Sequence, residues 1–310
     1  MFLTTFYTMC SLIIILGIGY YLSVTGKIDD NLNQGFSYLL TNVTLPCTIL
    51  MALNISMDSV KVHEIFLTLG IYFAYFIIVM IVSYGICKLL KVSDHKNGVI
   101  VTSLAFGNFG FIGFPLVEQI VGVESKFFVA LAQIPFNLLL LSIGVYLLQG
   151  DSDDKSFSFK KLMSPGFISV IIGLFMFSFQ VKFPYPIETA IGYIAGMTTP
   201  LSLLILGKFL SDLDFKETFM DKEVLLISTF NLIIIPIIFM VIFGGVTENH
   251  ILLTSSITLF ALPSGTLVTI FAKNYGADYI LASKLVFVST VYSVITIPAF
   301  VTILTWYLKI

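Results

Sequence analysis

Long apolar segments, separated by short charged or turn-rich breaks, follow one another along the whole chain. Each is long enough for a helix that crosses the hydrocarbon core of a bilayer, which takes about 20 residues. The pattern predicts ten spans, at 3–24, 32–54, 64–87, 98–121, 127–149, 164–180, 187–208, 223–244, 250–273 and 279–307. The breaks are too short to hold a soluble domain, which excludes a receptor or enzyme with a catalytic module outside the membrane.

Composition supports the same class of protein. The 310 residues are 57% hydrophobic and 11% charged, whereas a soluble domain has about 25% charged residues. A soluble protein of this composition could not cover its surface with polar groups. We therefore expect an all-α membrane protein. The net charge of −2 gives no reason to expect nucleic acid as a partner, and the absence of Arg removes bidentate clamps for a carboxylate.

The lysines lie mainly on one side of the predicted spans. Eleven fall in odd-numbered breaks: Lys27, Lys88, Lys91, Lys96, Lys155, Lys160, Lys161, Lys208, Lys216, Lys222 and Lys273. Four fall in even-numbered breaks or at the ends: Lys61, Lys126, Lys182 and Lys309. The positive-inside rule places the first group in the cytoplasm. This predicts a multi-pass protein of the cell (inner) membrane with both termini outside, and a first span that is not a cleaved signal because no basic residue precedes Lys27.

The longest charged break, 151–161, lies at the middle of the chain and prompts a search for repeats. A shift of 154 residues places Thr44-Leu45-Pro46 over Thr198-Thr199-Pro200, and a shift of 152 places Thr102-Ser103 over Thr254-Ser255. Both shifts pair spans of the first half with spans of the second, 2 with 7 and 4 with 9. Because five spans is an odd number, the second half would enter the membrane inverted. The sequence thus predicts repeats at 1–150 and 151–310, the plan of many secondary transporters.

Spans 4 and 9 contain helix-breaking residues at mid-membrane: Gly107, Gly110, Gly113 and Pro115 in the first, and Pro263 and Gly265 in the second. An interior Gly costs about 1 kcal/mol and a Pro about 3 kcal/mol relative to Ala. Unwound backbone at membrane depth is tolerated only where protein or a water-filled cavity satisfies it. Half-helices beginning near the two prolines would direct free N–H groups at the gap and favour an anion. Close helix packing is the alternative explanation of these glycines.

Polar side chains accompany the two breaks. Asn108, in the first, could hold a substrate carboxylate or cap the unwound backbone. Ser264 and Thr266, in the second, could serve a ligand or bond back to their own helix. Gln133 and Asn137 are four residues apart on span 5 and share a face, from which they would line a substrate route or bond to neighbouring helices.

Glu118 is the only carboxylate that the pattern places well inside an apolar span, about one turn after Pro115. A carboxylate in the membrane is a functional hypothesis by default, and this one is a candidate to carry a coupling proton or ion. It could equally lie in an outer vestibule or favour the N-terminal end of its half-helix. Glu64, at the outer start of span 3, is expected at the interface. No metal-ligand spacing and no catalytic pair occurs, so no metal, cofactor or enzyme activity is expected.

Three segments carry a family resemblance: 17–50, GNFGFIGFPL at 107–116, and 261–298. In order and spacing they resemble the auxin efflux carrier family, which includes bacterial malate and malonate permeases and plant auxin exporters. The resemblance implies a ten-helix inverted-repeat fold related to bile-acid sodium symporters, with broken helices 4 and 9 crossing. Helices 1, 2, 6 and 7 would form a scaffold, and helices 3–5 and 8–10 a transport domain. The family's crossover asparagine matches Asn108.

The leading hypothesis is a secondary transporter that moves a small organic anion, such as a malate-like dicarboxylate, by alternating access at the crossover. The alternatives are a sodium-coupled organic-anion symporter of the bile-acid-carrier type and a gated anion channel. The expected partners are the anion, a coupling proton or sodium ion, the lipid bilayer and a second copy of the chain in a homodimer.

Overall fold

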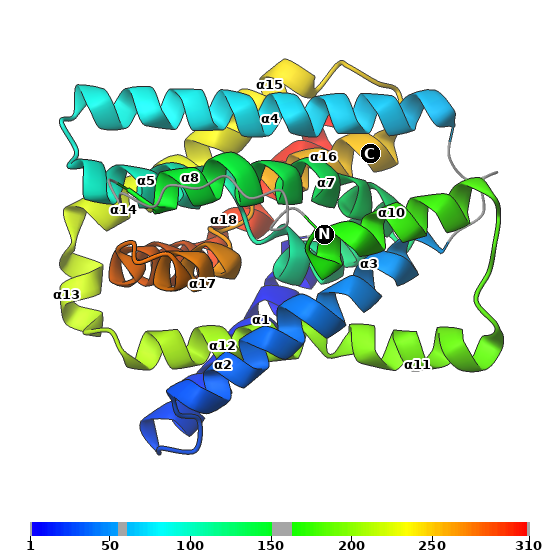
Figure 1. Ribbon diagram of the computed structural model, residues 1–310. Helices are drawn as coiled ribbons and strands as arrows, with labels where there is room; N and C mark the ends of the chain where they lie inside the picture. Colours follow the sequence, from blue (N-terminus) through cyan, green and yellow to red (C-terminus); the bar gives the residue numbers. More distant parts are fainter. Residues whose placement is uncertain (1, 55–60, 151–162, 309–310) are drawn as a thin grey trace.

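The structure, a computed structural model, describes residues 2–54, 61–150 and 163–308, and these residues are almost entirely helical (Figure 1). The first half contains α1 (Phe2–Val24), α2 (Asp30–Leu39), η1 (Leu40–Thr44), α3 (Leu45–Leu53), α4 (Val62–Leu89), α5 (Asp94–Ala105), η3 (Phe109–Gly113), α6 (Phe114–Val121), α7 (Ser125–Leu139), η4 (Leu140–Gly144) and α8 (Val145–Leu148). The second half contains α10 (Pro165–Ser178), α11 (Tyr185–Gly196), α12 (Thr198–Ser211), α13 (Phe215–Met220), α14 (Lys222–Thr229), η5 (Phe230–Ile234), α15 (Ile235–Phe243), α16 (His250–Phe260), α17 (Thr266–Asn274) and α18 (Tyr279–Leu308).

Seven helical runs of the described residues are long and apolar enough to cross a membrane: Phe2–Val24, Asp30–Leu53, Val62–Leu89, Ser125–Leu148, Tyr185–Ser211, Lys222–Phe243 and Tyr279–Leu308. They correspond to predicted spans 1, 2, 3, 5, 7, 8 and 10, which confirms an all-helical membrane protein. The other three predicted spans contain shorter apolar helices, Phe109–Val121, Pro165–Ser178 and His250–Phe260. Spans 4 and 9 fall below the length of a continuous crossing helix because each is interrupted.

Three of the prolines are accommodated by π-helical turns. Pro46, Pro115 and Pro236 each occupy the second position of an α-helix that directly follows a π-helical segment, η1, η3 and η5 respectively. Proline lacks an N–H group and its ring clashes with the carbonyl four residues earlier in an α-helix. A wider turn relieves that clash, and such turns occur where a helix is distorted. These prolines therefore bend their helices without ending them.

Some helix contacts join the two halves of the chain and others lie within one half. α1 lies against α12, α3 against α10 and α11, and α7 against α16, whereas α4 packs on α5 and α7, and α18 on α14 and α17. In Figure 1, α4 runs near the top of the view and α11 and α12 run near the bottom, while α3 lies obliquely between them and α2 continues in the same direction across α12. Gly19 and Gly207 allow α1 and α12 to touch, since a Cβ on Gly207 would lie 2.5 Å from the Tyr20 nitrogen and one on Gly19 would lie 2.7 Å from Leu204 Cα. Small residues serve this purpose between membrane helices.

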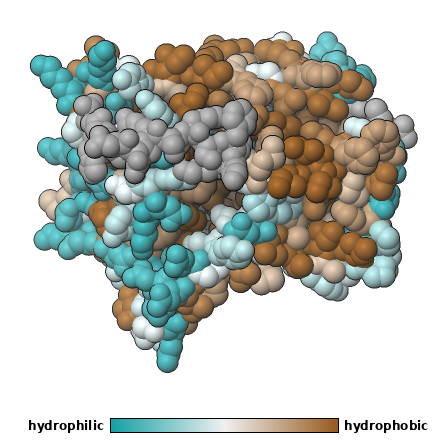
Figure 2. Space-filling model, in the orientation of Figure 1, coloured by the Kyte–Doolittle hydropathy of each residue, from teal (hydrophilic) through white to brown (hydrophobic). Residues whose placement is uncertain are grey.

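The surface is apolar over much of its area, and hydrophilic residues gather mainly toward the end at which α13 lies (Figures 1 and 2). Exposed Lys88, Lys216 and Lys222 belong to this end. Large apolar side chains are exposed elsewhere, including Phe66 at 70% and Trp306 at 81%. A monomeric soluble protein rarely exposes contiguous apolar surface on this scale, so the surface fits a lipid environment.

Candidate functional site

The two interrupted spans meet at their interruptions. α5 ends at Ala105 and η3 begins at Phe109, whereas α16 ends at Phe260 and α17 begins at Thr266. Gly107 and Ser264, between these helices, form an isolated antiparallel β-bridge. The Asn108 N–H donates to the Pro263 carbonyl at 2.8 Å, and the Gly265 N–H donates to the Phe106 carbonyl at 2.9 Å. Each break therefore satisfies polar backbone groups of the other, which is what unwound backbone needs at membrane depth.

Glycine is required where the two breaks touch. A Cβ on Gly265 would lie 2.8 Å from the Phe106 carbonyl oxygen and 3.0 Å from that of Gly107. A Cβ on Gly113 would lie 2.8 Å from a methyl carbon of Leu259. Close packing and the break therefore have the same cause at Gly265, whose clash is with backbone atoms, whereas at Gly113 the neighbour is a side chain that can move.

The half-helices begin near the two prolines, as expected, although neither helical run begins at its proline. The first begins at Phe109, six residues before Pro115, and the second at Thr266, three residues after Pro263. Pro115 stays inside the helical run because the π-helical turn of η3 precedes it. Pro263 lies in the extended segment, where its missing N–H costs nothing and its carbonyl accepts from Asn108. The prolines therefore mark the neighbourhood of both helix starts, since α6 begins beside Pro115 and α17 three residues after Pro263, but not the π-helical turn that extends the first run back to Phe109.

The beginnings of the two half-helices face the bridge without side-chain caps. Asn108 precedes η3 and Gly265 precedes α17, and neither position has a side-chain capping hydrogen bond. The N-terminus of a helix carries a partial positive charge and uncapped N–H groups. Two such ends meeting in one place form an environment suited to an anion.

Asn108 is the side chain of the bridge with the most unused hydrogen-bonding capacity. It is 1% exposed, its Nδ2 donates to Thr266 Oγ1 at 3.3 Å, and its Oδ1 has no partner among the described residues. A primary amide has two donor hydrogens and an acceptor oxygen, so one N–H and the oxygen remain available. Buried polar groups without partners usually have a reason, and a ligand would supply one here.

Ser264 has its hydrogen bonds within the protein. Its Oγ accepts from Asn231 Nδ2 at 3.4 Å, and its backbone N–H donates to Ser289 Oγ at 3.1 Å. The bridge is thereby tied to η5 and α18. The sequence did not identify Ser289, which stands in an apolar run with no pattern that marks it.

A cavity of about 500 Å³ opens beside the first break, between α3, α6 and the junction of α11 and α12. Gly110 and Pro115 line it, together with Thr198 and Thr199 from the second half of the chain. The Thr199 hydroxyl donates to the Phe111 carbonyl at 2.9 Å, so it satisfies a backbone oxygen of the π-helical turn. The cavity gives the first break a polar approach that is built from both halves.

Glu118 also lines this cavity and forms an ion pair with Lys126, at 2.6 Å between Nζ and Oε2. Their side chains are 35% and 32% exposed, so Glu118 is less enclosed than its sequence position suggests. Glu64, expected at the interface, is the more buried carboxylate at 7% exposed, and its Oε1 accepts from Asn249 Nδ2 at 2.9 Å. A sequence does not reveal that the 244–249 connection covers the start of α4.

Gln133 and Asn137 lie on α7 and are buried, at 1% and 7% exposed. Asn137 Nδ2 donates to the backbone carbonyl of Gln133 at 2.7 Å, and Gln133 Nε2 has no partner among the described residues. Neither lines the cavity beside the first break. Asn137 therefore bonds to its own helix, an arrangement that neither expectation for this pair included.

No three His, Cys, Asp or Glu side chains gather into a metal-ligand group within residues 2–54, 61–150 and 163–308. The polar groups at the bridge are amides, hydroxyls and backbone groups. The arrangement can bind and release a small polar ligand, and no nucleophile–base pair accompanies it in the described part of the chain.

Comparison with known proteins assigns the family. The model of the family described as membrane transport protein matches residues 4–153 and, a second time, residues 151–301, which indicates two related halves. An uncharacterized transporter of Methanocaldococcus jannaschii is 24% identical over 297 residues, covering 92% of this chain and 94% of the relative. An uncharacterized transporter of Methanothermobacter thermautotrophicus is 22% identical over 298 residues, covering 94% and 95%. The chain therefore belongs to the membrane transport protein family, the auxin efflux carrier family, and is a transporter rather than an enzyme.

Proposed function

We propose that this chain is a secondary transporter of a small organic anion, a malate-like dicarboxylate or a related carboxylate, which binds where the two helix breaks meet. The observation that carries the proposal is the bridge between Gly107 and Ser264, at which two uncapped half-helices begin beside Asn108. Breaks at corresponding places in two halves are a mark of transporter binding sites. The second Nδ2–H of Asn108 and backbone N–H groups at the two helix starts would hold the carboxylate, and the Asn108 oxygen would accept from a hydroxyl group of the anion.

Alternating access would come from one group of helices moving against another. The proposed scaffold is α1, α2–α3, α10 and α11–α12, whose members pack on one another, and the proposed transport domain contains α4–α8 and α14–α18. The repeats would be residues 1–150 and 151–310, inverted relative to each other. The cavity beside the first break lies between the two groups, as a route to the site should. The lysine-rich end would face the cytoplasm, with both termini outside.

The test is counterflow of malate. Purified protein in liposomes loaded with unlabelled malate should take up labelled malate, with a pH gradient or external sodium revealing the coupling ion. Asn108→Ala should abolish counterflow and leave the melting temperature within a few degrees, because the side-chain hydrogen bond that it removes is one of 3.3 Å, worth about 1 kcal/mol. Gln149→Ala, which removes an amide at the end of α8, is the matched control and should transport normally.

Counterflow by Asn108→Ala equal to that of the parent protein would refute the role given to Asn108. Large currents without saturation or counterflow would indicate an anion channel. Absence of malate counterflow from folded protein would reject malate, and the same assay with monocarboxylates and aromatic acids would then test the wider class.

A further inference from the structure

A second polar cavity lies on the opposite side of the bridge, near the lysine-rich end. It measures about 540 Å³ and is enclosed by α2, η1, α12 and α17. The repeat relates it to the first cavity. The first is lined by the later parts of spans 2 and 4 and the early part of span 7, and the second by the later parts of spans 7 and 9 and the early part of span 2. The two cavities are thus formed by equivalent surfaces of the two halves.

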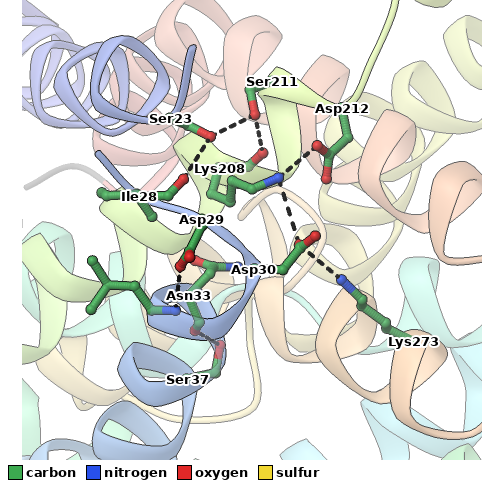
Figure 3. Close-up of polar contacts among 11 residues, drawn as sticks. Ser23, Ile28, Asp29, Asp30, Asn33, Ser37, Lys208, Ser211, Asp212 and Lys273 are labelled. Carbon is green, nitrogen blue, oxygen red and sulfur yellow. Dashed lines mark hydrogen bonds and ion pairs between the residues drawn. The ribbon is translucent and has the colours of Figure 1, made fainter. Parts of the chain in front are cut away.

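A cluster of charges stands at this second cavity (Figure 3). Asp30 Oδ1, on α2, lies 3.4 Å from Lys273 Nζ, on α17, and 3.7 Å from Lys208 Nζ, on α12. Lys208 Nζ lies 2.6 Å from Asp212 Oδ1 as well. Asp30 and Lys273 both line the cavity. One carboxylate therefore stands between two ammonium groups at the wall of a water-accessible space.

The members of this cluster differ in how firmly the protein holds them. The Lys208 side chain is 9% exposed and keeps Asp212 as a second partner, whereas the Asp30 side chain is 72% exposed and that of Lys273 42%. An ion pair this exposed contributes little stability. Another carboxylate could replace Asp30 at small cost, and the two ammonium groups would remain in place to receive it.

The cavity offers two further features to a ligand. Asn33 lines it, is 4% exposed, and has an Oδ1 without a partner among the described residues; this oxygen can accept from a hydroxyl group of a ligand but not bind its carboxylate. Lys273 Nζ lies 6.0 Å from the centre of the Phe209 ring and 5.4 Å from that of Tyr279. Cations are attracted to aromatic faces at such distances, which helps to keep this flexible side chain at the cavity.

We propose that this second cavity is an anion-binding vestibule, in which the carboxylate of the transported anion displaces Asp30 and binds Lys273 and Lys208 before it reaches the bridge. The identity of the anion rests on the proposed function. That the ligand is negatively charged rests on the geometry of the cluster. Asp30 belongs to α2 of the proposed scaffold, and Lys273 belongs to α17 of the proposed transport domain. Displacement of Asp30 therefore replaces a contact between the two groups with a contact to the substrate.

Thiol labelling tests the vestibule without knowledge of the substrate. The background has Cys10, Cys47 and Cys87, all free, replaced by serine or alanine, and the reporter is Thr41→Cys on the cavity wall. The purified protein is labelled with an anionic and a cationic methanethiosulfonate of similar size, and the ratio of their rates is measured. Because detergent leaves both ends accessible, orientation does not affect the result. Ser37→Cys, on the same wall, is a second reporter.

We expect the ratio of the anionic to the cationic rate to fall about fourfold in Lys273→Gln and to rise by a similar factor in Asp30→Asn at low salt. One unit charge about 10 Å away across water changes the local interaction energy of each reagent by about 0.4 kcal/mol, with opposite signs for the two reagents. The ratio of their rates therefore changes about fourfold. Lys216→Gln removes an exposed lysine of α13 that does not line the cavity and should leave the ratio unchanged.

A ratio that does not respond to Lys273→Gln and Asp30→Asn overturns the vestibule, and so do reporters that react with neither reagent, since a vestibule must admit a small anion. Malate is then added as a competitor. Slower labelling of the parent protein, with less protection in Lys273→Gln, supports malate as the occupant. A ratio that responds to both substitutions, with labelling that malate does not slow, keeps the vestibule and overturns malate as its ligand, which separates the two proposals.

Discussion

Gly265→Ala places a methyl group between the two helix breaks. The new Cβ would lie 2.8 Å from the Phe106 oxygen and 3.0 Å from the Gly107 oxygen. Both neighbours are backbone atoms, so no side chain can rotate away, and the segments must separate. Separation strains the two hydrogen bonds of the bridge, from Asn108 to Pro263 and from Gly265 to Phe106.

The magnitude follows from these contacts. Overpacking a dense site costs about 1–3 kcal/mol, and each weakened hydrogen bond about 0.5–1.5 kcal/mol. Alanine offsets about 0.5 kcal/mol by restricting the unfolded chain, because Gly265 has φ −78° and ψ 134°, which alanine adopts readily. The sum is a loss of about 1.5–5.5 kcal/mol, or about 3–11 °C at roughly 2 °C per kcal/mol for a chain of this size.

The assay is the melting temperature in detergent, read as the fraction of protein that stays monodisperse after heating, together with counterflow in liposomes. Gly70→Ala is the matched control, because Gly70 lies within α4 and a Cβ there meets no atom within 4 Å. It should melt at or slightly above the parent temperature. If Gly265→Ala has the same melting temperature as Gly70→Ala and still transports, the reasoning that close backbone contact at Gly265 stabilises the bridge is wrong.

Two further predictions concern the scaffold and the first cavity. Gly207→Ala should lower the melting temperature at least as much as Gly265→Ala, because its Cβ would lie 2.5 Å from the Tyr20 nitrogen; an unchanged melting curve would show that α1 and α12 separate freely. Glu118→Gln should change stability by no more than about 1 kcal/mol, since its pair with Lys126 is about one-third exposed. In the same variant counterflow should persist while its stimulation by a pH gradient is lost; stimulation equal to that of the parent protein would remove Glu118 as the coupling group.

The sequence predicted the structure correctly wherever a local pattern allows only one backbone conformation. Runs of apolar residues of this length can satisfy their backbone in lipid only as helices. Glycine and proline at mid-membrane disfavour a continuous helix, and the structure interrupts the chain at Gly107 and Pro263 as expected. Local rules failed for Pro115, because a π-helical turn keeps that residue inside the helix.

Contacts between distant residues could not be predicted in the same way. Glu118 was expected to be a solitary carboxylate, yet Lys126 of the next helix pairs with it. Ser289 supports the second break from α18, 25 residues away, and nothing in its neighbourhood marks it. The cluster of Asp30, Lys208 and Lys273 joins positions up to 243 residues apart.

By itself the sequence determined that the chain is a helical membrane protein, where its helices are interrupted, and that its two halves carry matching interruptions, because hydrophobic length and helix-breaking residues act locally. The tertiary structure decided which backbone groups the two breaks offer each other, which amide remains free, and which charges stand at each cavity. Those outcomes depend on the separation of side chains that meet only when helices from both halves pack. A difference of an ångström there decides whether a polar group is satisfied by the protein or left for a ligand.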